Sequence, residues 1–292
     1  MLLQAIVLVA AIFGEWLFIR KTKAKISEAV LVSAILFTLT LPPATPFWVA
    51  IVGILFGIIF GKMVFGGFGK NVFNPALVGR AFVYVSFAGP MTAQWSSHFS
   101  KGLGGFAAYA APVLSIDTLS SATPMLAYRA SGALPKLLSV ILGTVNGSLG
   151  ETSGLLIVIG GIYLLVTKTA AWQSVAGTLL GFTAMSLLLG SMGFAQVLPL
   201  GYGLLSGGFL FGTFFMVTDP ISSPKTKEAK WIYGLLIGTV TVVIRGFALF
   251  AGGIMFAILI GNTFAPLMDE AVKAVKKKQK ERSKDNDKKQ AS

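Results

Sequence analysis

Long apolar stretches separated by short charged clusters run through most of this 292-residue sequence. Each stretch has roughly the 17 to 25 residues that a membrane-spanning helix requires. Hydrophobic residues make up 54% of the chain and charged residues only 12%, which is more apolar surface than one soluble domain of this length can bury. Runs such as Val49 to Phe60 and Leu155 to Val166 show no barrel-type alternation. The pattern predicts an all-α, polytopic integral membrane bundle.

The positions of the apolar stretches predict about nine crossings, with broken or re-entrant segments among them. We expect spans at about 2–19, 26–41, 46–62, 75–89, 153–167, 170–190, 197–217, 230–245 and 247–268. Positive charges follow the first stretch and do not precede it, so we expect a retained anchor that starts outside. Segment 134–149 must then enter and leave on one side, because a full crossing there would place the basic C-terminus outside.

The net charge is +13, and nine of the 24 lysines and arginines lie in the C-terminal tail. Lysines and arginines beside a final apolar helix are typical of a cytoplasmic flank, so we expect a lipid bilayer as partner and no nucleic acid. The tail also contains Glu281, Asp285 and Asp287 and lacks aromatic residues. We therefore predict a transmembrane domain at 1–268 and a disordered cytoplasmic tail at 269–292.

The sequence contains no cysteine and a single histidine, His98. This composition excludes disulfides, cysteine ligation of iron–sulfur clusters and a pair of axial histidines for haem. We expect no metal site in the chain, and any redox cofactor should be organic.

Two segments, 66–75 and 216–224, interrupt the apolar pattern in the same way. Each places Asn-Pro or Asp-Pro, at Asn74 and Asp219, directly after a glycine-containing apolar helix. Proline lacks an amide donor and glycine allows close approach, so a helix can stop here and irregular backbone can face a cavity. Both side chains can also cap a following helix. The residues alone leave capped loops and a cofactor or ion path equally open.

Five separated segments resemble the RnfD/NqrB family in their order and spacing. They are 66–82 (GGFGKNVFNPALVGRAF), 120–124 (SSATP), 147–153 (GSLGETS), 205–224 (LSGGFLFGTFFMVTDPISSP) and 262–267 (NTFAPL). The compact length resembles RnfD more than NqrB. Family members usually carry another cytoplasmic segment and one more helix before the region that matches Leu2 to Lys25.

The resemblance implies a covalent flavin. In this family the threonine of a Ser-x-Ala-Thr sequence, here Thr123, is esterified through its hydroxyl to the phosphate of FMN by a separate flavin transferase. Asp117, Ser120, Ser121 and Ala122 would be recognition or packing neighbours, and no catalytic residue is assigned. A hydroxyl on an exposed segment is a competent acceptor in metal-assisted phosphoryl transfer. The sequence leaves open whether a second flavin, such as riboflavin, binds noncovalently.

Charged residues in the spans supply the other candidates, because a charge in hydrocarbon is costly. Arg80 and Arg245 either neutralise a flavin phosphate or a quinone-like anion, or extend toward the membrane surface. Arg80 and Asn74 complete the expected cofactor-binding set. Glu151 and Asp219 are the candidates for a cation or proton path, although helix capping explains both almost as well.

The function that the resemblance implies is that of a multi-pass subunit in a bacterial inner membrane, with the flavin-bearing loop outside and the basic tail in the cytoplasm. It would carry electrons within an Rnf-type ferredoxin:NAD oxidoreductase that translocates Na+ or H+. Partner subunits would supply iron–sulfur and further flavin centres, and the chain would not be active alone. The alternatives are an NqrB-type subunit of a sodium-pumping NADH:quinone reductase and a solute channel or transporter without redox chemistry.

Overall fold

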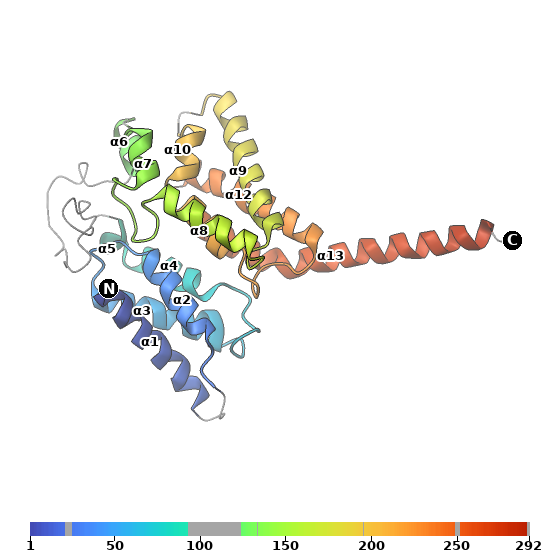
Figure 1. The fold of residues 1–292 in the computed structure, drawn as a ribbon, viewed down its shortest axis with the longest axis horizontal. Helices are drawn as coiled ribbons and strands as arrows, with labels where there is room; N and C mark the ends of the chain where they lie inside the picture. Colours follow the sequence, from blue (N-terminus) through green and yellow to red (C-terminus); the bar gives the residue numbers. More distant parts are fainter. Residues whose placement is uncertain (21–24, 93–123, 133, 195, 249–251, 291–292) are drawn as a thin grey trace.

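A computed structural model of the chain describes residues 1–20, 25–92, 124–132, 134–194, 196–248 and 252–290, and the regular structure in these ranges is entirely helical (Figure 1). The α-helices are α1 (Leu2–Ile19), α2 (Ala29–Leu39), α3 (Phe47–Ile58), α4 (Pro75–Ser86), α5 (Ala88–Thr92), α6 (Pro124–Ser131), α7 (Leu137–Leu142), α8 (Gly154–Val166), α9 (Trp172–Ser191), α10 (Leu200–Leu205), α11 (Phe209–Phe211), α12 (Lys227–Phe247) and α13 (Gly253–Gln290). Two π-helices, η1 (Ile59–Met63) and η2 (Gly212–Met216), continue α3 and α11.

Helix length and composition confirm a helical membrane protein. In the described part of the chain, four helices are long and apolar enough to cross a membrane: α1, α9, α12 and the first part of α13. Ala29–Leu39, Phe47–Met63 and Gly154–Val166 are shorter apolar helices. An 11-residue helix rises about 16 Å, roughly half the hydrocarbon thickness. Ala29–Leu39 and Gly154–Val166 are therefore too short to cross the hydrocarbon layer as helices alone.

The helices form two packed groups. In the N-terminal group α3 contacts α1 and α4, and in the C-terminal group α12 contacts α9 and α13. The contact between α9 and α12 depends on small residues: Gly177 and Gly181 face Gly234 and Gly238. A Cβ atom at Gly181 or Gly238 would overlap the backbone of the opposite helix. This spacing of glycines allows the close backbone approach that holds helices together where lipid provides no hydrophobic driving force.

Hydrogen bonds place several predicted cytoplasmic segments at one end of the bundle. The Asn74 amide, after η1, donates to Asn262 Oδ1 at 3.4 Å. The Lys225 amide, before α12, donates to Asp269 Oδ2 at 2.7 Å. Asn262 and Asp269 both lie on α13, just before its exposed C-terminal extension. This is the arrangement that the distribution of basic residues requires of a membrane protein.

The segment predicted as one span at 197–217 is broken, and in this respect the prediction was wrong. Gly207 and Gly208 have φ of 62° and 68°, the left-handed region that glycine tolerates, and they separate α10 from α11. The stretch 134–149 contributes α7, whose six residues rise about 9 Å and cannot cross a bilayer. The two short helices α7 and α10 are neighbours, since the Tyr202 hydroxyl of α10 donates to the Pro135 carbonyl at 2.9 Å.

The C-terminal tail is helical in the structure, where the charge pattern predicts disorder. Helix α13 continues to Gln290 and extends away from the bundle (Figure 1). Its alanines, lysines, glutamates and glutamines are strong helix formers. The Lys273 ammonium donates to Glu270 at 2.8 Å, and that of Lys276 donates to Glu228 on α12 at 2.7 Å. High charge thus opposes burial without opposing helix formation. The predicted boundary between transmembrane domain and tail at residue 268 stays a prediction.

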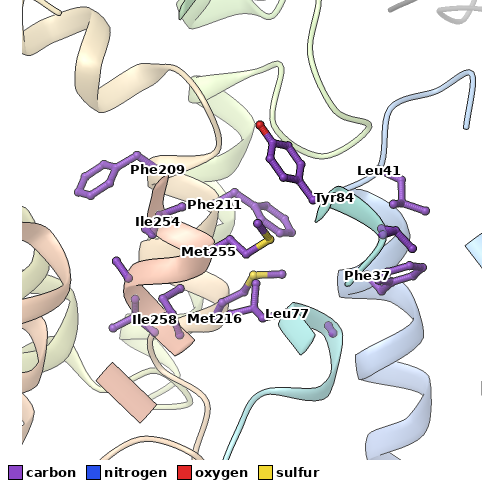
Figure 2. Packing of buried hydrophobic residues seen from close by; sticks show 14 of the residues in the cluster. Phe37, Leu41, Leu77, Tyr84, Phe209, Phe211, Met216, Ile254, Met255 and Ile258 are labelled. Atoms are coloured by element: carbon purple, nitrogen blue, oxygen red, sulfur yellow. The ribbon is translucent and has the colours of Figure 1, made fainter. Parts of the chain in front are cut away.

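An apolar layer joins the two groups of helices. It consists of Leu77 of α4, Phe211 of α11, Met216 of η2, and Met255 and Ile258 of α13, which Figure 2 shows pointing toward one another. All five side chains are buried. This layer separates two clusters of polar residues.

Candidate functional site

The outer polar cluster lies at the end opposite the basic loops and is centred on Arg80 and Glu151. Arg80, on α4, points its Nη2 toward Glu151 Oε1 at 3.8 Å, and the side chains are 8% and 13% exposed. Glu151 lies in the turn before α8, which is fixed by backbone hydrogen bonds to the end of α2: the Gly150 amide donates to the Leu39 carbonyl at 2.7 Å. Arg80 and Glu151, which are separate candidates in the sequence, thus form a pair in the fold.

Glycine at position 208 makes room for the carboxylate of Glu151. A Cβ atom at Gly208 would overlap the Glu151 carboxyl group, and the residue also has a positive φ. The break between α10 and α11 therefore brings a bare backbone against an acidic side chain. Close approach of unwound backbone to a charged group is typical of binding sites in membrane transport proteins.

Arg245 stabilises the other side of this break. Its Nη1 donates to the Gly203 carbonyl at 2.8 Å, and its Nη2 donates to the carbonyls of Ser206 and Gly207 at 3.0 and 2.7 Å. These carbonyls belong to the C-terminal end of α10, which has no further helical turn to bond them and carries a partial negative charge. Arg245 is therefore a helix-capping cation inside the bundle, buried to 5% exposure.

Two small cavities border Glu151. The first, beside Arg80 and Gly208, has a volume of about 10 Å³, and the second, beside Asn146 and Ser206, has a volume of about 30 Å³. About 10 to 15 Å³ is enough for one water molecule. Arg80 lines the first cavity and Ser206 the second, and among the described residues Arg80 Nη1 and Ser206 Oγ are buried without a hydrogen-bond partner, as is Ser148 Oγ three residues before Glu151.

The inner polar cluster joins the two segments that resemble each other in sequence. The Asn74 side chain accepts hydrogen bonds from the amides of Ala76 and Leu77, which confirms its predicted capping of α4. Asn262, fully buried, donates to the Ser222 carbonyl at 3.1 Å and to the Tyr233 hydroxyl at 2.8 Å. Asn262 thus connects the turn at 74 with the turn at 219–222.

Asp219 does not cap a helix. Its carboxylate accepts the Ile221 amide at 3.0 Å and the Ser222 hydroxyl at 2.8 Å, and the next helix, α12, begins only at Lys227. The residue that holds the start of α12 is Asp269, which accepts the amide and the hydroxyl of Thr226, each at 2.8 Å. Asp219 therefore shapes a turn, and the role of Asp269 was not predicted from the sequence.

A buried ion pair at the inner end of the N-terminal group was also not predicted. Lys62, in η1, donates to Glu15 Oε2 at 3.0 Å and to the Ser27 hydroxyl. The side chains of the pair are 2% and 3% exposed, and the Ser27 amide bonds the other carboxylate oxygen at 3.1 Å. In the sequence, Lys62 looks like another basic residue of a cytoplasmic loop. The signal that could have revealed the pair is Glu15, an acidic residue within the first apolar stretch.

The flavin-attachment candidates Asp117, Ser120, Ser121, Ala122 and Thr123 lie outside the described residues. Of the other predicted residues, the structure brings Arg80 to Glu151 in the outer cluster and links Asn74 to the turn of Asp219 in the inner one. Across the described ranges, no group of three potential metal-ligating side chains occurs.

These features define a class: a helical membrane protein whose broken helices place polar clusters on either side of an apolar layer. The sequence profile of the NQR2, RnfD, RnfE family matches residues 1–278. The chain belongs to this family.

In curated relatives, about two fifths of the aligned residues are identical to those of this chain. The NqrB component of the Na(+)-translocating NADH-quinone reductase of Ectopseudomonas mendocina is 41% identical over 92% of this chain and 65% of its own length. The proteins of the same name in Azotobacter vinelandii and Klebsiella pneumoniae are 40% and 38% identical, over 92% and 89% of this chain and 66% and 63% of their own lengths. The chain thus spans about two thirds of the length of these relatives.

The comparisons correct the preference for RnfD. The relatives are NqrB proteins of the quinone reductase, which favours the alternative reading of the sequence. The preference for RnfD depended on chain length, and length does not report which motifs two proteins share. The identity extends over nearly the whole chain and is the stronger criterion.

Proposed function

We propose that this chain is an NqrB-type membrane subunit of a redox-driven, Na+-translocating NADH:quinone reductase. The observation that carries the proposal is the 41% identity to NqrB over 92% of the chain. The remaining subunits would supply nicotinamide and iron–sulfur chemistry, since the sequence contains no cysteine. An Rnf-type complex with ferredoxin as electron donor is the alternative within the family.

In this proposal Thr123 carries FMN as a phosphoester, with Asp117 and residues 120–122 as its local surroundings. The flavin, when bound, supplies one- and two-electron transfer. A tether through the phosphate leaves the isoalloxazine ring free to react while preventing its loss from the membrane surface. Arg80 remains a proposed flavin-phosphate partner, although in the structure a carboxylate already faces it.

The two polar clusters provide a proposed path for the cation. Glu151 would receive it in the outer cluster, and Asp219 would receive it near the inner one. Between them the apolar layer excludes water, so passage requires the two groups of helices to move relative to each other. A path with charged residues at both ends and an apolar barrier between them suits coupled transport better than free conduction.

The covalent flavin is directly testable. After co-expression of the full-length chain with a flavin transferase, we expect a fluorescent flavin band on a denaturing gel that disappears in Thr123→Ala, because the acceptor hydroxyl is gone. Thr144→Ala, which removes an exposed threonine elsewhere, should keep the band at full intensity. A native chain without fluorescence under a competent transferase would contradict the flavin assignment and favour the non-redox transporter.

A further inference from the structure

The pair formed by Arg80 and Glu151 is close enough for attraction but has poor hydrogen-bond geometry. The distance of 3.8 Å between Arg80 Nη2 and Glu151 Oε1 exceeds the roughly 2.7 to 2.9 Å of a charge-assisted hydrogen bond. Both side chains are largely removed from water. A buried ion pair offsets its desolvation cost only when geometry is good and the other polar atoms are bonded. This pair fulfils neither condition.

Three of the unbonded buried polar atoms in the described residues are relevant here, one of them on the pair and one on a residue that shares a cavity with Glu151. Within the described residues, Arg80 Nη1 and the hydroxyls of Ser148 and Ser206 have no hydrogen-bond partner, and the three residues are 7%, 1% and 4% exposed. Buried polar groups in native proteins are almost always bonded, to protein or to ordered water. The Ser206 hydroxyl shares a cavity with Glu151, so its oxygen is open to a further ligand, whereas the Arg80 N–H is a donor that needs an acceptor.

Cavity and ligand chemistry indicate a small cation. Glu151 lines both small cavities, and Ser206 lines the larger one, so a carboxylate and a hydroxyl oxygen border the same space. Oxygen ligands of this kind suit hard cations. Arg80 opposes a cation here, because its positive charge lies at the same carboxylate. Arg80 and a bound cation must therefore compete.

We propose that Arg80 is a built-in competitor at a monovalent-cation site on Glu151. When no cation is bound, the guanidinium neutralises the carboxylate. When Na+ binds Glu151 and the oxygens beside it, the attraction that holds Arg80 is lost. Arg80 belongs to α4 in the N-terminal group, and Gly208, against which Glu151 packs, belongs to the C-terminal group. When Na+ replaces the Arg80 guanidinium at Glu151, the contact between the two groups of helices therefore changes.

This inference rests on the proposed function, in which Glu151 belongs to the cation path. It adds that Arg80 lowers the affinity of the site, so that the cation can leave. A site that binds too tightly does not release its ion, and transport requires both steps.

The test measures Na+ binding to the purified full-length chain in detergent, by titration calorimetry with NaCl in choline chloride at constant ionic strength. Arg80→Gln removes the competing charge and should lower the apparent Kd for Na+ at least about tenfold, which is about 1.4 kcal/mol. Glu151→Gln and the double variant should show no saturable binding. Lys276→Gln, which breaks an exposed ion pair, should bind Na+ as the native chain does.

Two results would overturn the inference: an unchanged or weaker Na+ affinity in Arg80→Gln, or native affinity in Glu151→Gln. If Arg80→Gln does not fold, Arg80→Lys serves in its place, because it keeps the positive charge on a side chain of different length and shape. Its Kd for Na+ should differ from that of the native chain. An unchanged Kd would contradict the competition. In-gel flavin fluorescence of the same variants separates the two hypotheses. Fluorescence without a Na+ effect removes only the competition, whereas loss of fluorescence in the native chain removes the flavin assignment.

Discussion

Replacing Lys62 with methionine is expected to lower the free energy of unfolding by about 3 to 5 kcal/mol, because it leaves the buried carboxylate of Glu15 without its counter-charge. Methionine keeps most of the length and the apolar stem of lysine, so the effect reports the charge and not a cavity. Thermal denaturation of the detergent-solubilised chain should show a strongly reduced Tm.

A matched lysine and a double variant separate this effect from a general loss of charge. Lys70→Met changes an exposed lysine in the following loop and should leave Tm nearly unchanged. Glu15→Gln combined with Lys62→Met removes both charges and should recover much of the loss, since a neutral buried pair has no uncompensated ion. A Lys62→Met chain as stable as the native one would show that the pair contributes nothing.

The second large effect is expected at Arg245. Arg245→Met removes the donor to three carbonyls of the broken segment, those of Gly203, Ser206 and Gly207. An unbonded buried carbonyl costs about 1 to 3 kcal/mol, so the combined loss should exceed about 3 kcal/mol. We expect a lower Tm and faster proteolysis around residues 203–208.

Arg245→Lys restores a positive charge near these carbonyls but not the planar set of donors, so it should recover part of the stability. Arg282→Met, at an exposed position on the extension of α13, is the control and should behave as the native chain does. Equal stability of Arg245→Met and the native chain would contradict the capping role.

The sequence predicted those features that depend on composition and on local chemistry. Apolar length predicted the helical membrane bundle, and Asn74 before Pro75 predicted the cap of α4. The break at Gly207 and Gly208 was not predicted, because an apolar run that contains glycines is equally typical of a continuous span. Local pattern cannot report a positive φ that long-range partners such as Arg245 stabilise.

Pairing across long sequence separations explains the other failures. Glu15 and Lys62 are 47 residues apart, and Asn74 and Asn262 are 188 apart, so neither contact leaves a periodic signal. Each of these charges and amides was visible as a polar residue next to or within an apolar stretch. Only the fold shows which of them neutralise each other and which, like Arg80 and Glu151, form a loose pair.

The most direct test of the proposed function uses the complex that this chain is proposed to assemble into. An affinity tag on the chain allows purification of that complex from membranes and its reconstitution into vesicles. The proposed function predicts quinone reduction by NADH, uptake of ²²Na+ coupled to it, and loss of both in Thr123→Ala. A purified complex that oxidises no NADH with quinone and moves no Na+ would contradict it.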